Sequence, residues 1–465
     1  MSDTLMVGVS GVRGIVGKDL TAEVVLRWAE AFGRTRREAG GGKDDAGVVV
    51  LGRDARQSGP EFARAAAQGL TRAGCDVIDV GLVPTPTVQL AVLHHRAAGG
   101  IIITASHNPI EWNSLKFVGA DGIFLDTEAG ARVAELEKKP AGGTRGSGSA
   151  KADQGAVARH LERVLALPVI DSARIRKRKF QVALDCVRGA GGVIMPELLQ
   201  GLGCEVTGIN LETDGRFPRA PEPIPENLDA LSDLVRSSGA DLGMAVDPDV
   251  DRLALVDETG TPIGEDYTLA FAVRAVCGSG NVVRRTMRRL RSRPVVCNLS
   301  TSLVVEDAAR DCGAKVIRTP VGEVHVAREL VRRGAEIGGE GNGGVMYAPL
   351  HAGRDAPAGA ALVLELLARE GKKVSELVRA SPRYVIVKAK VERGADLERA
   401  YAALRARFPD AAADAQDGLR LAWPDRWLHV RPSNTEPIVR FIAEGPTAAA
   451  AQDLIKEGRR LCAGS

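Results

Sequence analysis

The chain has few aromatic residues and little excess charge, and both shortages argue against a nucleic-acid partner. Aromatic residues make up only 4% of the 465 residues, so few rings are present on which bases could stack. Basic runs occur at 174–179 and 284–293, but the net charge is only +3. We interpret these runs as solvated surface and expect no nucleic-acid partner.

Cysteines and long apolar runs are also scarce. The seven cysteines are scattered and form no Cys-x-x-Cys pair, which argues against a disulfide framework or a zinc site and fits a reducing compartment. No apolar run approaches the roughly 18 residues of a membrane span, and the N-terminal stretch lacks the pattern of a cleaved signal peptide. We expect a cytoplasmic protein with no membrane partner, either a monomer or a homodimer.

The chain is long, and one pattern of expected strands and a helix recurs in it three times. At 465 residues it should form three or four domains. Each copy has a strand, a helix, a second strand and a later apolar run that ends in a polar loop. The opening strands lie at 48–51, 182–184 and 295–297, and the later runs at 101–103, 242–246 and 335–337. The runs lead to Ser106, Asp247 and Glu340, which should lie at equivalent ligand-binding edges of three sheets.

The last 80 or so residues have a different pattern. A helical stretch at 397–408 is followed by alternating apolar residues at 419–444, which is typical of antiparallel strands. The low-complexity stretch 140–149 suggests a linker or surface loop. We therefore predict an α/β fold of three similar α/β sheet domains plus a C-terminal α+β domain, arranged around a central cleft. The predicted domains are 1–150, 151–256, 257–372 and 373–465.

The loop at 104–109 follows an apolar β-branched run and contains Ser106. A strand that ends here, with Asn108 and Pro109 forcing a turn, would expose one hydroxyl at the mouth of a sheet. Such a position suits a nucleophile. Taken alone, such a turn more often has a serine that merely caps the next helix.

The segment 247–252 places three carboxylates two residues apart, so one loop can direct Asp247, Asp249 and Asp251 at a single point. An EF-hand is excluded because Arg252 stands where its glycine belongs and a strand, not a helix, should follow. A hard cation such as Mg²⁺ fits this loop, and Arg252 beside it suits a phosphate.

Two further loops suggest ligand contacts. The segment 339–344 matches the dinucleotide pattern G-x-G-x-x-G, but the following residues are extended rather than helical, so a dehydrogenase does not fit. Its glycines instead leave Glu340 and Asn342 close to a ligand, as in sugar recognition. Near the C-terminus, cationic, hydroxyl and amide groups form a candidate phosphate cradle at Arg431, Ser433, Asn434, Thr435 and Arg440.

Together, the loops at 104–109, 247–252, 339–344 and 431–437 resemble those of the α-D-phosphohexomutase family, and the likeness covers the whole chain. The resemblance implies four domains around a cleft and a phosphoserine at Ser106 that binds Mg²⁺ with the three aspartates. It also implies phosphate transfer between O1 and O6 of a hexose phosphate, with a hexose 1,6-bisphosphate as intermediate and activator. Pro248 and Val250 stand where most members carry glycine.

The same resemblance suggests roles for further residues. Arg13, His107 and Lys116 would surround the transferring phosphate, with Lys116 as general acid/base. Glu340 would bind sugar hydroxyls, and the C-terminal cradle would bind the phosphate that is not transferring. A non-catalytic sugar-phosphate binding protein would keep this cradle without needing a phosphoserine.

Glu323 gives the one indication of which sugar is used. Family members that accept glucose or mannose phosphates tend to have His at this position, whereas phosphoglucosamine mutases tend to have an acid. A carboxylate there could pair with the 2-ammonium group of glucosamine 6-phosphate. His325 could instead contact a neutral sugar, so a phosphomannomutase/phosphoglucomutase stays the alternative.

Overall fold

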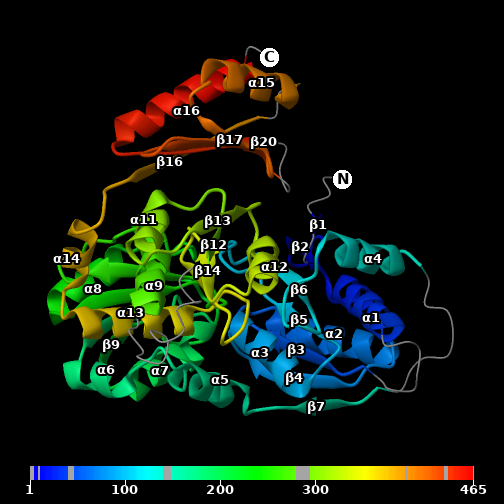
Figure 1. The fold of residues 1–465 in the computed structure, drawn as a ribbon. Coiled ribbons are helices and arrows are strands. Elements are labelled where there is room, and N and C mark those ends of the chain that lie inside the picture. Colours follow the sequence, from blue (N-terminus) through cyan, green and yellow to red (C-terminus); the bar gives the residue numbers. More distant parts are fainter. Residues whose placement is uncertain are drawn as a thin grey trace.

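Three α/β units and a smaller C-terminal unit make up the protein in the computed structural model (Figure 1). The structure describes residues 5–8, 11–39, 47–139, 148–278, 294–392, 396–433 and 438–463. Within these ranges, no helix is both long enough and apolar enough to cross a membrane.

The first unit contains a seven-stranded sheet in the order β1-β2-β6-β5-β3-β4-β7. Its strands are β1 (Met6–Gly8), β2 (Gly11–Ile15), β3 (Val49–Arg53), β4 (Val77–Leu82), β5 (Gly99–Ile103), β6 (Trp112–Gly119) and β7 (Ala150–Ala152). Its helices are α1 (Ala22–Ala39), α2 (Gly59–Arg72), α3 (Thr85–His95) and α4 (Thr127–Glu137). Every residue of β5 is buried, as expected for a central strand covered on both faces.

The second and third units each contain a four-stranded sheet, in the orders β11-β10-β8-β9 and β13-β12-β14-β15. The second has β8 (Gln181–Asp185), β9 (Glu205–Ile209), β10 (Leu242–Val246), β11 (Leu253–Asp257), α5 (Ala156–Leu165), α6 (Ser172–Arg178), α7 (Met195–Gly201), α8 (Asp229–Ser238) and the short helices η1 (Ala190–Val193) and η2 (Pro225–Asn227). The third has α9 (Asp266–Gly278), β12 (Val295–Asn298), α11 (Leu303–Asp311), β13 (Val316–Thr319), α12 (Glu323–Arg333), β14 (Ile337–Glu340), β15 (Gly344–Tyr347), α13 (Ala356–Glu370) and α14 (Val374–Arg379).

The three units repeat one strand arrangement, which confirms the predicted repeat. In each, a first strand pairs in parallel with two others, and the later of these pairs antiparallel with a fourth. The sets are β3, β4, β5 and β6, then β8, β9, β10 and β11, then β12, β13, β14 and β15. Ser106, Asp247 and Glu340 therefore lie at the ends of equivalent strands β5, β10 and β14.

The C-terminal unit has the predicted antiparallel sheet, in the order β16-β20-β19-β18-β17. Its elements are β16 (Val385–Glu392), α15 (Leu397–Arg407), β17 (Ala412–Asp414), β18 (Leu419–Ala422), β19 (Trp427–Pro432), β20 (Ile438–Gly445) and α16 (Ala448–Ala463). Figure 1 shows α15 and α16 on the side of this sheet away from the other units. The alternation of β16 follows this arrangement, because Val387 and Ala389 pack in the core while Lys388 and Lys390 are exposed.

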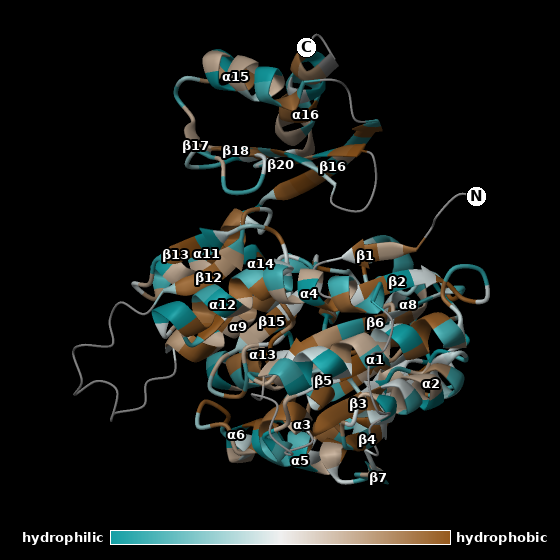
Figure 2. Ribbon diagram, turned by 90° about the vertical axis from the view of Figure 1, so that its right-hand side faces the viewer, coloured by the Kyte–Doolittle hydropathy of each residue, from teal (hydrophilic) through white to brown (hydrophobic). Residues whose placement is uncertain are grey.

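The hydrophobic cores show which units are joined most firmly. One continuous cluster joins the second and third units, where residues of α13 such as Leu362 and Leu366 are buried. The C-terminal unit has its own cluster, around Leu428 and Phe441. It stands apart above the rest in Figure 2, where brown hydrophobic segments mark strands of the larger body.

Candidate active site

The Ser106 loop is held from inside by Arg56, a residue that is 1% exposed. Its two Nη atoms donate to four backbone carbonyls, those of Ser106 (2.7 Å), Asn108 (2.6 Å), Pro109 (2.7 Å) and Trp112 (2.8 Å). Ser106 itself adopts a φ of 48°, a left-handed conformation that is uncommon for a residue other than glycine. Arg56 therefore fixes a strained turn in one shape.

The Ser106 hydroxyl lies against the second unit. Its Oγ donates to Asp247 Oδ2 at 2.8 Å and lies 3.3 Å from His107 Nδ1. The expectation of an exposed hydroxyl is wrong, because Ser106 is 4% exposed and the Asp247 loop covers it. The serine and aspartate loops, 141 positions apart, thus form one site.

Basic side chains lie near the Ser106 loop. Arg13 Nη1 donates to Asn108 Oδ1 at 2.8 Å and so supports the same loop. Burial, together with the positive charges of Arg252 and Arg13, lowers the pKa of His107 well below its usual value. The imidazole is therefore neutral at neutral pH.

Asp247, Asp249 and Asp251 are fully buried, and ligand oxygens of the three lie within 4.8 Å of one another. Asp249 Oδ2 accepts from Thr85 Oγ1 (2.7 Å) and Lys116 Nζ (2.8 Å). In the described part of the chain, Asp249 Oδ1 and Asp251 Oδ1 accept no hydrogen bond.

A cation fits this cluster on physical grounds. Buried oxygens without partners are costly, and burial and repulsion by Asp251 and Asp249 raise the pKa of Asp247 well above its usual value. A hard divalent cation with oxygen ligands would remove both penalties. The loop reaches this geometry although Val250 has a φ of 63°; its fully buried side chain offsets the backbone strain.

The loops of the third unit bring together Glu323, Glu340 and a residue that sequence reasoning missed, Arg354. Glu340 Oε1 accepts from Asn298 Nδ2 at 2.8 Å, and Oε2 accepts from Arg354 Nη1 at 2.7 Å. Arg354 Nε lies 3.1 Å from Glu323 Oε2. Asn342 Oδ1 accepts from Gly344 N at 3.2 Å, so this oxygen shapes the loop.

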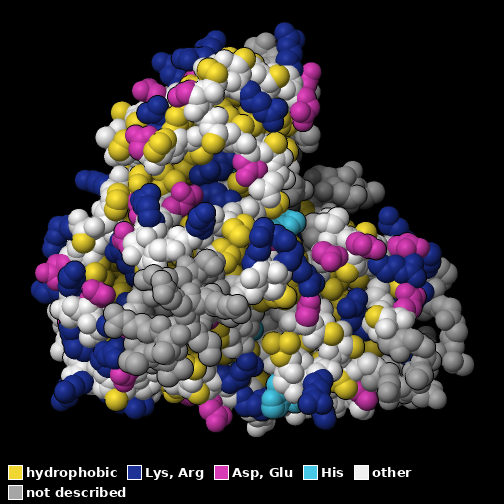
Figure 3. Space-filling view, viewed as in Figure 1, with side chains coloured by type: hydrophobic (Ala, Val, Ile, Leu, Met, Phe, Trp, Pro, Cys, Tyr) yellow, Lys and Arg dark blue, Asp and Glu magenta, His cyan; other side chains and the backbone are white. Residues whose placement is uncertain are grey.

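The sheet of the C-terminal unit carries a row of cations. Arg431 on β19, Arg440 on β20 and Lys390 on β16 are direct cross-strand neighbours. Like charges placed side by side repel, which favours an anion between them. Figure 3 shows dark-blue Lys and Arg side chains below this unit.

The remaining part of the predicted cradle is only partly described. Arg431 Nε lies 2.9 Å from Asp417 Oδ2, which also accepts from Val321 N of the third unit at 3.0 Å. Ser433 N donates to Ile438 O at 2.9 Å. Asn434 and Thr435 lie outside the described residues.

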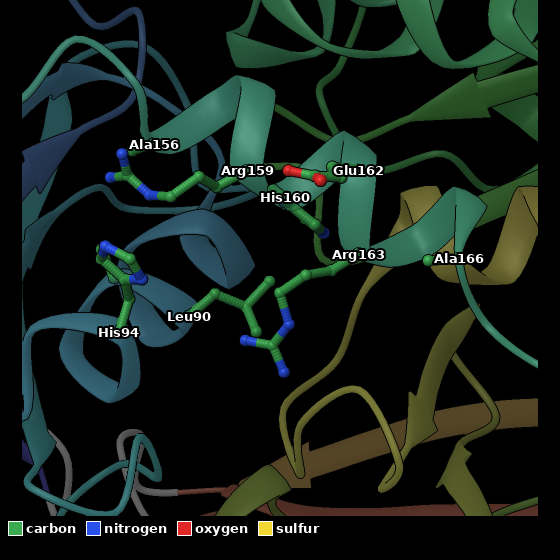
Figure 4. A pocket seen from close by; sticks show the side chains of 9 residues that line it. Leu90, His94, Ala156, Arg159, His160, Glu162, Arg163 and Ala166 are labelled. Carbon is green, nitrogen blue, oxygen red and sulfur yellow. The ribbon is translucent and has the colours of Figure 1, made fainter.

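A cavity of about 370 Å³ lies elsewhere, between α3 and α5 (Figure 4). Its arginines already have protein partners, since Arg159 pairs with Asp153 and Arg163 donates to Leu350 O at 2.6 Å. His160 is bonded on both sides, to Thr87 and Asp355. We assign no ligand to this cavity.

The residues that the sequence analysis missed all act over long separations in the chain. Arg56 stands 50 positions from Ser106, and Arg354 stands 103 positions from Asp251. The only local indication of Arg56 is its place just after β3, at the same sheet edge as Ser106. Nothing in the sequence around Thr85 or Lys390 indicated that these residues belong to the site.

Profiles of four domains match nearly the whole chain, in order. They are described as Phosphoglucomutase/phosphomannomutase alpha/beta/alpha domain I (residues 4–141), domain II (158–260), domain III (266–384) and C-terminal domain (386–461).

Full-length relatives agree with these matches. The chain is 37% identical to a "Phosphoglucomutase/phosphomannomutase" of Thermococcus kodakarensis, over 98% of this chain and 97% of the relative. It is also 37% identical to a "Probable phosphoglucosamine mutase" of Methanopyrus kandleri, over 97% and 96%. The crystal structure of a phosphoglucomutase/phosphomannomutase family protein from Burkholderia thailandensis superposes with a TM-score of 0.85 at 29% identity, covering 99% of this chain and 97% of that one. The chain therefore belongs to the phosphoglucomutase/phosphomannomutase family and is a phosphohexomutase enzyme.

Proposed function

We propose that this enzyme moves phosphate between O6 and O1 of a hexose phosphate through a phosphoserine at Ser106. The hydrogen bond of 2.8 Å from Ser106 Oγ to Asp247, inside a cluster of three buried aspartates, carries the proposal. Phosphorylated Ser106 would pass its phosphoryl group to O1 of the 6-phosphate. The resulting 1,6-bisphosphate would reorient within the site so that its O6 phosphoryl group faces Ser106. Transfer of that group to Ser106 would leave the hexose 1-phosphate and restore the phosphoserine.

Asp247, Asp249 and Asp251 would hold Mg²⁺ together with the phosphoserine. The metal supplies charge neutralisation for phosphoryl transfer, in which positioning and electrostatics dominate. Lys116 lies beside Asp249, at 2.8 Å, and is our candidate general acid/base. Arg13, Arg252 and neutral His107 would surround the transferring phosphate.

The phosphate that is not transferring would bind the C-terminal unit at Arg431, Ser433 and Arg440. Lys390 joins this site because it is the cross-strand neighbour of Arg440. Asn434 and Thr435 complete the cradle in the proposal. The row of like charges supports an anion site here.

Glucosamine 6-phosphate is the substrate we propose, with mannose and glucose phosphates as the alternative. Glu323 carries this choice. It lies at the start of α12, and its Oε2 accepts no hydrogen bond from the described residues, although Arg354 Nε lies 3.1 Å away. The relatives divide between both names, since one is a phosphoglucomutase/phosphomannomutase and another a probable phosphoglucosamine mutase.

Replacing Ser106 tests the mechanism. We expect Ser106→Ala to abolish turnover of every hexose phosphate. Intact-mass spectrometry should find a phosphoryl group on the wild type and none on the variant. Catalytic amounts of hexose 1,6-bisphosphate should activate dephosphorylated wild type but not the variant.

Ser381→Ala is the matched control, because this buried hydroxyl donates only to Leu377 O, at 3.0 Å, outside the site. It should keep activity and phosphorylation. Turnover that survives in pure Ser106→Ala enzyme contradicts the proposal. Comparing kcat/KM for glucosamine 6-phosphate, mannose 1-phosphate and glucose 1-phosphate on one preparation decides the substrate.

A further inference from the structure

Arg354 lies at the centre of the site, among Asp251, Glu323 and Glu340. It lies between β15 and α13, is 8% exposed, and forms an isolated bridge with Met346. Its side chain passes close over the sugar-binding loop, because a Cβ at Gly344 would lie only 2.2 Å from Arg354 Cδ. Gly344 therefore leaves the space through which this side chain reaches Asp251 and Glu340.

The guanidinium contacts three carboxylates from three separate segments. Nη2 donates to Asp251 Oδ2 at 2.6 Å, Nη1 donates to Glu340 Oε2 at 2.7 Å, and Nε lies 3.1 Å from Glu323 Oε2. The backbone N of Arg354 also donates to Glu323 Oε1 at 3.2 Å. One side chain thus joins a proposed metal ligand to both acids proposed to face the sugar.

The contact with Asp251 also decides which of its oxygens faces the aspartate cluster. Because Arg354 takes Oδ2, Oδ1 is the oxygen left without a hydrogen bond. The planar fork of an arginine can hold several carboxylates in fixed directions, which the single ammonium group of a lysine cannot do.

We propose that Arg354 is a positioning residue that couples the binding of Mg²⁺ to the binding of the sugar phosphate. This inference rests on the proposed function. Each ligand fixes carboxylates that share one guanidinium, so the first ligand orders part of the site for the second. Such coupling is reciprocal and typically amounts to about fivefold or more in affinity.

Calorimetric titration of dephosphorylated enzyme with glucosamine 6-phosphate tests this, with and without MgCl₂ after removal of metal by a chelator. In the wild type, Mg²⁺ should tighten sugar-phosphate binding about fivefold or more. In Arg354→Lys, which keeps the charge but loses the fork, this ratio should fall below about twofold. Arg354→Lys should also weaken Mg²⁺ binding in the absence of sugar, because Asp251 loses its fixed orientation.

Arg369→Gln is the matched control, because among the described residues this arginine on α13 donates to the carbonyls of Ala275 and Arg274, both at 2.9 Å, and pairs with Glu370, all outside the site. It should keep the wild-type ratio. Gly344→Ala is a second test variant, which keeps the arginine at position 354 but displaces its side chain. It should also lose the coupling. If Arg354→Lys fails to fold, Gly344→Ala alone tests the inference.

Three outcomes overturn the inference. If wild type binds the sugar phosphate equally with and without Mg²⁺, or if both test variants keep the wild-type ratio, Arg354 does not couple the two ligands while the proposed function stands. If the wild type binds no hexose phosphate at all, the proposed function and the inference fall together.

Discussion

Glu323 is the residue on which sugar choice depends most directly. Burial raises the pKa of its carboxyl group from the ordinary 4.5 to about 7, even though Arg354 opposes this shift. Near neutral pH the side chain therefore changes between a neutral acid and a carboxylate. The carboxylate holds a sugar ammonium more strongly than the neutral acid does, because both partners of the hydrogen bond are then charged.

We therefore predict that the preference for glucosamine 6-phosphate over mannose 6-phosphate is weak at pH 6 and rises toward pH 8. The rise should amount to roughly tenfold, the lower end of what a hydrogen bond to a charged group provides. In Glu323→Gln the ratio of the two kcat/KM values should not rise with pH. A wild-type ratio with the same pH dependence as the variant would assign sugar choice to another residue.

The sign of the same shift predicts an effect on stability. Since the pKa of Glu323 is raised in the folded state, the folded protein binds this proton more tightly than the unfolded chain. The stabilisation is complete below pH 4.5, the ordinary pKa, and is lost as pH rises to about 7. Melting temperatures of Glu323→Gln should accordingly fall less over this range than those of the wild type.

Arg56 is a positioning residue whose effect should appear in kcat. In Arg56→Lys the charge stays, but at least some of the four carbonyls of the Ser106 loop lose their donor, so the loop can shift. We predict that kcat falls about 10²-fold while KM changes much less, because a small displacement of reacting groups has this effect. Phosphorylation of Ser106 by the 1,6-bisphosphate should slow in parallel. A raised KM with unchanged kcat would argue against this role.

At the level of elements, the three equivalent strand ends could be predicted because each loop follows its own strand directly. Asp247, Asp249 and Asp251 form a local motif, and local spacing sufficed to place them at one point. Arg56 and Arg354 could not be found in this way, because their partners become neighbours only when separate segments pack. The burial of Ser106 under the Asp247 loop depends likewise on how two units meet, which no single segment specifies.

The aspartate loop predicts how the protein responds to metal. Three buried carboxylates repel one another, so a bound Mg²⁺ should stabilise the folded state by about 2.7 kcal/mol at a concentration 100 times its Kd. We expect chelation to abolish activity and to lower the melting temperature, and Mg²⁺ to restore both.

Asp249→Asn distinguishes Mg²⁺ bound at the aspartate cluster from Mg²⁺ bound more weakly elsewhere on the surface. The variant should lose most of the Mg²⁺-dependent shift in melting temperature. Asp214→Asn, which alters an aspartate paired with Arg188 away from the cluster, should keep the shift. Full wild-type activity after exhaustive chelation would contradict a metal role for the cluster.

On the scale of the whole molecule, the C-terminal unit contacts the third unit through polar contacts and has a separate core. Ser300 Oγ lies 2.8 Å from His429 Nδ1, and Leu303 N donates to Glu444 at 2.9 Å. The alternating apolar residues at 419–444 predicted antiparallel strands here, but not that Lys390 of β16 would lie beside Arg440 of β20, which in turn pairs with Arg431. That row arises only from the register of three strands.

Lys390→Ala should have opposite effects on the empty enzyme and on substrate binding. Removing one of three adjacent cations relieves repulsion, so the substrate-free protein should gain a few tenths of a kcal/mol in its free energy of unfolding. Losing a cation from the phosphate site should raise KM for the hexose phosphate roughly tenfold, equal to about 1.4 kcal/mol, with little change in kcat. Added salt should weaken substrate binding less in the variant than in the wild type.

Lys456→Ala, on the exposed face of α16, should change none of these quantities. A variant that is less stable and binds substrate as well as the wild type would show that Lys390 supports the sheet and does not contact the phosphate.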